Sequence, residues 1–154
     1  MPRLVAALAL ALLVGAGAPG ARAEGPLVEV WKTPRCGCCV KWIEHLEAHG
    51  FRVERHDLMD LSEVKRQNRV PRDMASCHTA TVGGYVIEGH VPAADVQRLL
   101  RERPAILGLA VPGMPHGSPG MESPTPEPYE VYTITRSGAG AVWARHEPQA
   151  TPAR

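Results

Sequence analysis

LVEVWKTPRCGCCV, at residues 27–40, places three cysteines within four positions, directly after an apolar segment typical of a buried strand. Cys36, Cys38 and Cys39 cannot all enter well-formed disulfides with one another. A disulfide requires a particular separation and torsion, and a ring closed through the adjacent pair would be strained. At least one thiol is therefore free for redox chemistry or for metal binding.

The residues after the cysteine loop predict an amphipathic helix. Trp42, Ile43 and Leu46 recur at helical spacing between Val40 and His49, and Gly50 is typical of a helix C-terminus. The first unit is therefore a strand at 27–31, the cysteine loop, and a helix at 40–49.

Further elements follow in an order that indicates the fold class. Residues 51–57 predict a second strand, and residues 60–63 have capping-box spacing for a short helix that ends near Asn68. Gly83-Gly84 predicts a hairpin between strands at 79–82 and 85–88, and Pro92 opens a helix that runs to about Arg103. The order β-α-β-α-β-β-α, with the cysteine loop between a strand and a helix, predicts an α/β protein with a thioredoxin-like domain.

The first 23 residues predict a secretory signal peptide. Arg3 is followed by an apolar run at 4–14, and Ala21-Arg22-Ala23 is typical of a cleavage site. The run is too short for a membrane-spanning helix, which needs about 20 apolar residues. We expect an exported, periplasmic protein without membrane insertion after cleavage, with the thioredoxin-like domain at residues 24–104.

Residues 105–146 predict a C-terminal extension that packs on this domain and contributes to the metal site. The many Pro and Gly residues at 108–128 argue against regular structure there. A hairpin is predicted from strands at 129–135 and 141–145. Residues 147–154 are expected to form a disordered tail.

Charge excludes some partners. The chain has 17 Lys and Arg residues against 16 Asp and Glu residues, and two of the basic residues lie in the predicted signal peptide. A nearly neutral mature chain has no basic surplus to neutralise phosphates, so we expect no nucleic-acid partner. We expect a monomer. The sequence contains no phosphate loop, Ser-His-Asp arrangement or carboxylate pair that would favour hydrolysis or group transfer.

The cysteine loop lies at a predicted helix N-terminus, whose unpaired N–H groups stabilise a thiolate, and Lys32 and Arg35 act in the same direction. Cys36 and Cys39 have the spacing of disulfide oxidoreductases, so they are the predicted catalytic pair. Cys38 is a further soft ligand that such enzymes do not need. The extra thiol therefore favours a metal site.

More candidate ligands lie outside the loop. Cys77 precedes the third predicted strand, where a thioredoxin-like fold would bring it opposite the other cysteines. Thioether, imidazole and thiolate ligands together suit copper(I) better than calcium, magnesium or manganese. His78 and His90 are further candidates outside the predicted metal-ligand set, which consists of Cys36, Cys38, Cys39, Cys77, Met114, His116 and Met121.

Zinc is the rival metal, because four cysteines can form a closed tetrahedral site. We expect the adjacent Cys38 and Cys39 to point in diverging directions, which would strain a single four-sulfur ion site. Sulfurs that bridge several copper(I) ions would avoid this strain. The sequence therefore favours a multinuclear copper-thiolate site.

The chain resembles the CopG-type periplasmic copper-resistance proteins, a CxCC family long described as a domain of unknown function. The resemblance spans residues 28–143 and rests on CGCC at 36–39, SCHTA at 76–80, GGYVIEGHVP at 83–92 and GLAVPGMP at 108–115. It implies a thioredoxin-like fold, copper bound beside the CxCC loop with help from the extension, and interconversion of copper(I) and copper(II). It also implies a role in copper resistance alongside efflux components of the cell envelope.

Two other functions remain open at this point. One is a periplasmic thiol–disulfide oxidoreductase, with Cys36 as nucleophile and Cys39 as resolving thiol. The other is a passive copper store or chaperone that does not change the charge of the metal. The oxidoreductase alternative predicts activity that survives the loss of Cys38 and Cys77.

Overall fold

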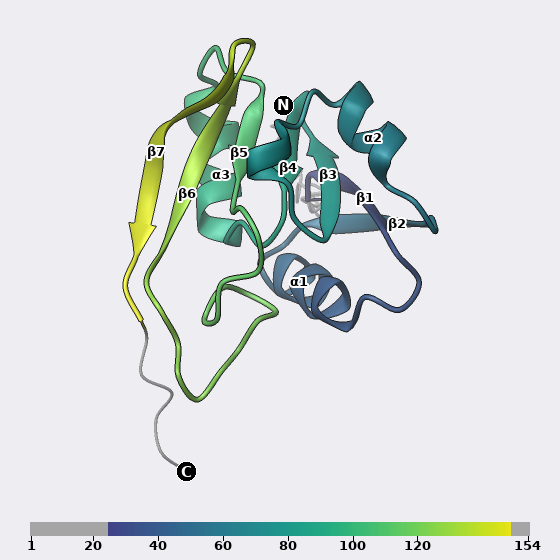
Figure 1. The fold of residues 1–154 in the computed structure, drawn as a ribbon, viewed down its shortest axis with the longest axis vertical. Coiled ribbons are helices and arrows are strands. Elements are labelled where there is room, and N and C mark those ends of the chain that lie inside the picture. Colours follow the sequence, from purple (N-terminus) through teal and green to yellow (C-terminus); the bar gives the residue numbers. More distant parts are fainter. Residues whose placement is uncertain (1–24, 149–154) are drawn as a thin grey trace, which may run out of the picture.

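A computed structural model of the chain describes residues 25–148. Its strands form one mixed sheet in the order β2-β1-β3-β4-β5-β6-β7 (Figure 1). The signal peptide predicted at 1–23 and the part of the predicted tail at 149–154 lie outside the described residues. The elements are β1 (Leu27–Lys32), α1 (Gly37–Ala48), β2 (Arg52–Asp57), α2 (Ser62–Gln67), a 3-10 turn η1 (Arg72–Met74), β3 (His78–Val82), β4 (Tyr85–Glu88), α3 (Ala93–Glu102), β5 (Gly108–Ala110), β6 (Tyr129–Thr135) and β7 (Gly138–His146).

The predicted α/β class is confirmed, and the elements from β1 to α3 occur in the predicted order. β1 pairs in parallel with β2 and antiparallel with β3, and β3 and β4 form the hairpin predicted at Gly83-Gly84. Both glycines have positive φ, as the tight turn requires. Because β1 and β2 are parallel, their carboxyl ends lie at the same edge of the sheet, next to the cysteine loop.

Helices cover both faces of the sheet. The main core joins α1 and α3 to one face, where Trp42, Leu46 and Leu99 are fully buried against Val30 and Ile87. A smaller cluster on the other face contains Met74, Val86, Ala110 and Ile134. No helix within residues 25–148 has the length and apolar character needed to cross a membrane.

Three local predictions are wrong. The capping box is absent, because Leu61 rather than Asp60 is the N-cap residue of α2 and makes no side-chain capping bond. The Asp60 carboxylate instead accepts hydrogen bonds from Ser62, and Glu63 pairs with Arg66. The stretch predicted to lack regular structure contains β5, which pairs with both β4 and β6. The C-terminal hairpin turns earlier than predicted, so that β7 already begins at Gly138.

The extension continues the sheet. β5 pairs in parallel with β4, and β6 and β7 follow it antiparallel, so residues 108–146 add three strands beside β4. Residues 111–128 form a long loop between β5 and β6, and at its start Val111 donates its backbone N–H to the Glu88 carbonyl oxygen of β4. Further along, Gly120 lies against the N-terminal part of α1.

Candidate metal centre

α1 begins three residues earlier than predicted, so the cysteines belong to its first turn. Cys36 is the N-cap residue, and its sulfur accepts a hydrogen bond from the Cys39 N–H at 3.3 Å. The unpaired N–H groups of a helix N-terminus need such an acceptor. The sequence CGCC thus places one sulfur at the cap and two in the turn that follows.

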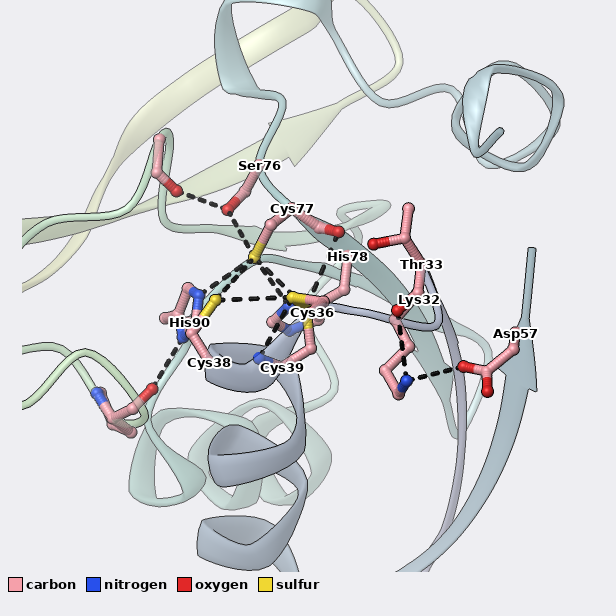
Figure 2. Close-up of a disulfide and its surroundings, with 12 residues drawn as sticks. Lys32, Thr33, Cys36, Cys38, Cys39, Asp57, Ser76, Cys77, His78 and His90 are labelled. Carbon is pink, nitrogen blue, oxygen red and sulfur yellow. Dashed lines mark hydrogen bonds and ion pairs between the residues drawn. A yellow bond between two sulfur atoms is a disulfide. The ribbon is translucent and has the colours of Figure 1, made fainter. Parts of the chain in front are cut away.

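The four cysteines form one sulfur cluster (Figure 2). Cys36 and Cys39 are joined by a disulfide, whereas Cys38 and Cys77 are free thiols. Cys38 Sγ lies 3.5 Å from Cys36 Sγ and 3.8 Å from Cys77 Sγ, and Cys77 Sγ lies 3.5 Å from Cys39 Sγ. Each sulfur therefore has two sulfur neighbours.

The side chains of Cys38 and Cys39 do not diverge as predicted. All four sulfurs lie within 4.8 Å of one another, because Cys77 approaches from the segment before β3 and contacts both. The geometric argument against a single ion, and so against zinc, is therefore wrong. The preference for copper depends on the softness of the ligands.

His90 faces the cluster with a defined tautomer. Its Nδ1 lies 2.8 Å from the Pro119 carbonyl oxygen, which can only accept, so Nδ1 carries the proton and donates it. The Nε2 of the neutral ring is then a lone-pair nitrogen, and it lies 3.1 Å from Cys77 Sγ. A histidine whose other nitrogen donates to a carbonyl is the usual arrangement of a metal ligand.

His78 adds a second imidazole on the other side of Cys77. Its Nδ1 lies 3.4 Å from Cys77 Sγ, and its buried Nε2 has no hydrogen-bond partner among the described residues. The ring packs against Trp42 at 4.3 Å and edge-on to His90 at 5.0 Å between centroids. Burial, with further contributions from His90 and Lys65, holds the pKa of His78 well below its usual range, so this imidazole is neutral.

Burial also controls protonation at the cluster. Desolvation, reinforced by Cys38, raises the pKa of Cys77 to about 12, while desolvation lowers the pKa of His90. The Lys32 ammonium, predicted to stabilise a thiolate, is paired with the Asp57 carboxylate at 2.6 Å and donates to the Thr33 carbonyl oxygen (Figure 2). Cys77 therefore stays a thiol at neutral pH until a metal or an oxidant displaces its proton.

A buried carboxylate fixes the segment that carries Cys77. Glu88, fully buried on β4, accepts the Ser76 N–H and the Thr79 hydroxyl, both at 2.7 Å, and pairs with the Lys65 ammonium from α2. These partners lie on both sides of Cys77 in the chain. The network therefore holds the backbone from which the fourth sulfur reaches the cluster.

The loop at 111–128 covers the cluster through its backbone. Gly120 has φ +87°, and a Cβ there would lie 2.6 Å from the Cys38 carbonyl oxygen and 2.9 Å from the Trp42 nitrogen. Only glycine allows so close an approach to α1. The neighbouring Pro119 carbonyl is thereby brought to His90.

The predicted ligands of this loop differ in their exposure to solvent. Met114 is 51% exposed, His116 is exposed and belongs to no described group of potential metal ligands, and Met121 is half-buried. Their role as ligands stays a prediction. The structure also brings His90, a candidate outside the predicted ligand set, to the cluster from the segment after the β3–β4 hairpin.

Comparison with solved structures settles the family. Two structures named copper resistance protein CopG, form 1 and form 2, are each 49% identical to this chain and align with a TM-score of 0.75, over 80% of this chain and 99% of theirs. The chain belongs to the CopG family. A family model described as a protein of unknown function, DUF411, also matches residues 74–121, which include Cys77, His90 and the start of the covering loop. No curated protein matches the chain.

Proposed function

We propose that this protein binds copper in the periplasm through Cys36, Cys38, Cys39 and Cys77 and serves copper resistance. The observation that carries the proposal is the gathering of four sulfurs within 4.8 Å, with two neutral imidazoles against Cys77. Thiolates are soft ligands that select copper(I), and imidazole also suits copper. The solved relatives are named for copper resistance, which agrees with this donor set.

The number of donors supports a multinuclear site. Four sulfurs and the nitrogens of His78 and His90 exceed the four ligands of a closed tetrahedral ion. Reduction of the Cys36–Cys39 disulfide makes all four sulfurs available as ligands. A group of bridging sulfurs would then hold more than one copper ion.

We extend the proposal to interconversion of copper(I) and copper(II). The thiolates stabilise copper(I), and the neutral imidazoles beside them provide nitrogen ligands that suit copper(II). Efflux components of the cell envelope are the expected partners for the released metal.

The test is anaerobic copper(I) loading of the reduced mature chain, followed by measurement of copper per protein. We expect more than one tightly held copper, lost in a Cys38→Ser, Cys77→Ser double variant. Met59→Leu is the matched control, because this thioether is 85% exposed on the loop after β2. Undiminished copper in the double variant would contradict the proposal.

One observation favours a second function. The Cys36–Cys39 disulfide at the N-terminus of α1 has the spacing and the place of a thiol–disulfide oxidoreductase. In that case reductase activity on protein disulfides would survive the double substitution while copper retention would be absent in the parent chain. Redox titration of the copper-loaded protein distinguishes a protein that interconverts copper(I) and copper(II) from a passive store, in which the copper does not change oxidation state.

A further inference from the structure

We propose that Cys38 and Cys77 are a second redox couple, which closes to a disulfide and thereby removes the last free thiols from the metal site. The inference deepens the proposed function and depends on it for the consequence for copper, but the formation of the bond does not require copper. It concerns the two thiols that the oxidised Cys36–Cys39 pair leaves over.

The arrangement of the sulfurs limits the choice of partner. Cys38 Sγ has two sulfur neighbours, Cys36 at 3.5 Å and Cys77 at 3.8 Å. Cys36 is already bonded to Cys39, so Cys77 is the free thiol within reach of Cys38. Closing the bond requires an approach of about 2 Å, which two side chains can share by rotation about χ1.

The surroundings hold both thiols in position and leave them accessible. Cys38 lies in the first turn of α1, and the Glu88 carboxylate fixes the backbone next to Cys77 through the Ser76 N–H. Both cysteines are partly exposed, whereas Cys39 is fully buried. A small oxidant can therefore reach Cys38 and Cys77 after Cys39 has been sealed in its own disulfide.

His90 provides a place for the proton. Its lone-pair nitrogen Nε2 lies 3.1 Å from Cys77 Sγ, because Nδ1 donates to the Pro119 carbonyl oxygen. In the reaction Cys38 first attacks one sulfur of a disulfide of the glutathione class, and its proton passes to the glutathione thiolate that leaves. Cys77 then attacks the sulfur of Cys38 in the mixed disulfide, and its proton passes by way of His90 Nε2 to the second leaving glutathione thiolate. The two cysteine thiols are oxidised by two electrons, and the glutathione disulfide is reduced to two thiols.

Oxidation and metal binding then exclude each other. With both disulfides closed, none of the four sulfurs is a thiolate, and the thiolate is the form that binds copper(I). The reduced chain can hold four more electrons than the fully oxidised chain. Its oxidation state therefore decides whether copper is held or released.

The experiment counts thiols in the copper-free mature chain, equilibrated in glutathione buffers of rising potential, alkylated and mapped by peptide mass spectrometry. We expect two successive losses of two thiols, with cross-linked peptides Cys36–Cys39 and Cys38–Cys77. Cys38→Ser and Cys77→Ser should each abolish only the second step. A Cys36→Ser, Cys39→Ser double variant should still form the Cys38–Cys77 bond.

Copper(I) binding by each oxidation state completes the test. Closure of both disulfides should weaken it by at least about 100-fold, because altering even an outer-shell partner of a metal ligand costs roughly 10–100-fold. The inference is wrong if Cys38 and Cys77 stay reduced in the most oxidising buffer or pair with other cysteines. In that case copper binding by the reduced chain would still support the proposed function. If the two cysteines pair but the reduced chain holds no copper, the proposed function fails and the redox couple remains.

Discussion

Replacing Gly120 by alanine should detach the covering loop from α1. The new Cβ would meet two backbone atoms of α1, at 2.6 Å from the Cys38 oxygen and 2.9 Å from the Trp42 nitrogen, and neither can move without distorting the helix. Overpacking of this kind costs about 1–3 kcal/mol. The left-handed backbone at φ +87° costs a residue with a Cβ about 1–2 kcal/mol more. We expect the free energy of unfolding to fall by about 2–5 kcal/mol if the loop stays in place.

Gly113→Ala is a matched control. Gly113 lies in the same loop at φ +66°, but a Cβ there would meet nothing within 4 Å. This variant should therefore lose only the backbone contribution, about 1–2 kcal/mol. The difference between the two variants isolates the contact with α1.

Urea unfolding gives the two free energies, and hydrogen exchange shows where the chain has opened. If the loop lifts to relieve the clash, the stability loss will be smaller, but the Gly117 and Met121 amides, which are bonded within the loop, should exchange faster in Gly120→Ala than in Gly113→Ala. Equal stability and equal exchange in the two variants would refute the close approach of the loop to the helix.

Two further changes test other parts of the fold. The His45 ring accepts the Ala93 N–H at 3.0 Å. Burial, followed by His49, lowers the pKa of His45, while Glu122 acts in the opposite direction. As the pH falls below 6.5, the unfolded chain therefore takes up a proton at this position before the folded chain does, and the free energy of unfolding decreases. His45→Gln, which keeps an acceptor but cannot titrate, should lose less stability in urea unfolding between about pH 7.5 and pH 5.5; an unchanged slope would contradict this. Lys65→Met leaves the buried Glu88 carboxylate without its cation and should cost about 3–5 kcal/mol, most of it recovered in Lys65→Met, Glu88→Gln. A double variant no more stable than the single one, measured by the same unfolding, would show that the loss has another cause.

The sequence predicted most of the first half of the fold, because its signals there are local. Helical spacing of Trp42, Ile43 and Leu46 and the Gly83-Gly84 turn each depend on a few adjacent residues. β5 escaped prediction because its three residues become a strand only by pairing with β4 and β6. The thioredoxin-like classification stays a prediction beyond the confirmed α/β class and element order.

The site was predictable in its sulfurs and much less so in its nitrogens. Three cysteines within four positions are a strong local signal, and Cys77 followed from its place before the third strand. His90 could not be distinguished from other histidines, since its role depends on the Pro119 carbonyl, 29 residues further along the chain. The approach of Cys38 and Cys39 to one point depends on where α1 begins, which the hydrophobic pattern did not fix.

The hydrogen bond from His90 to Pro119 also limits how mutation can alter the site. The acceptor is a main-chain carbonyl, so every amino acid at position 119 would offer the same atom. Single substitutions cannot delete it; they can only move it by changing the path of the loop. The tautomer of His90 is thus insulated from side-chain chemistry at its partner and depends on the absence of a side chain one position later, at Gly120.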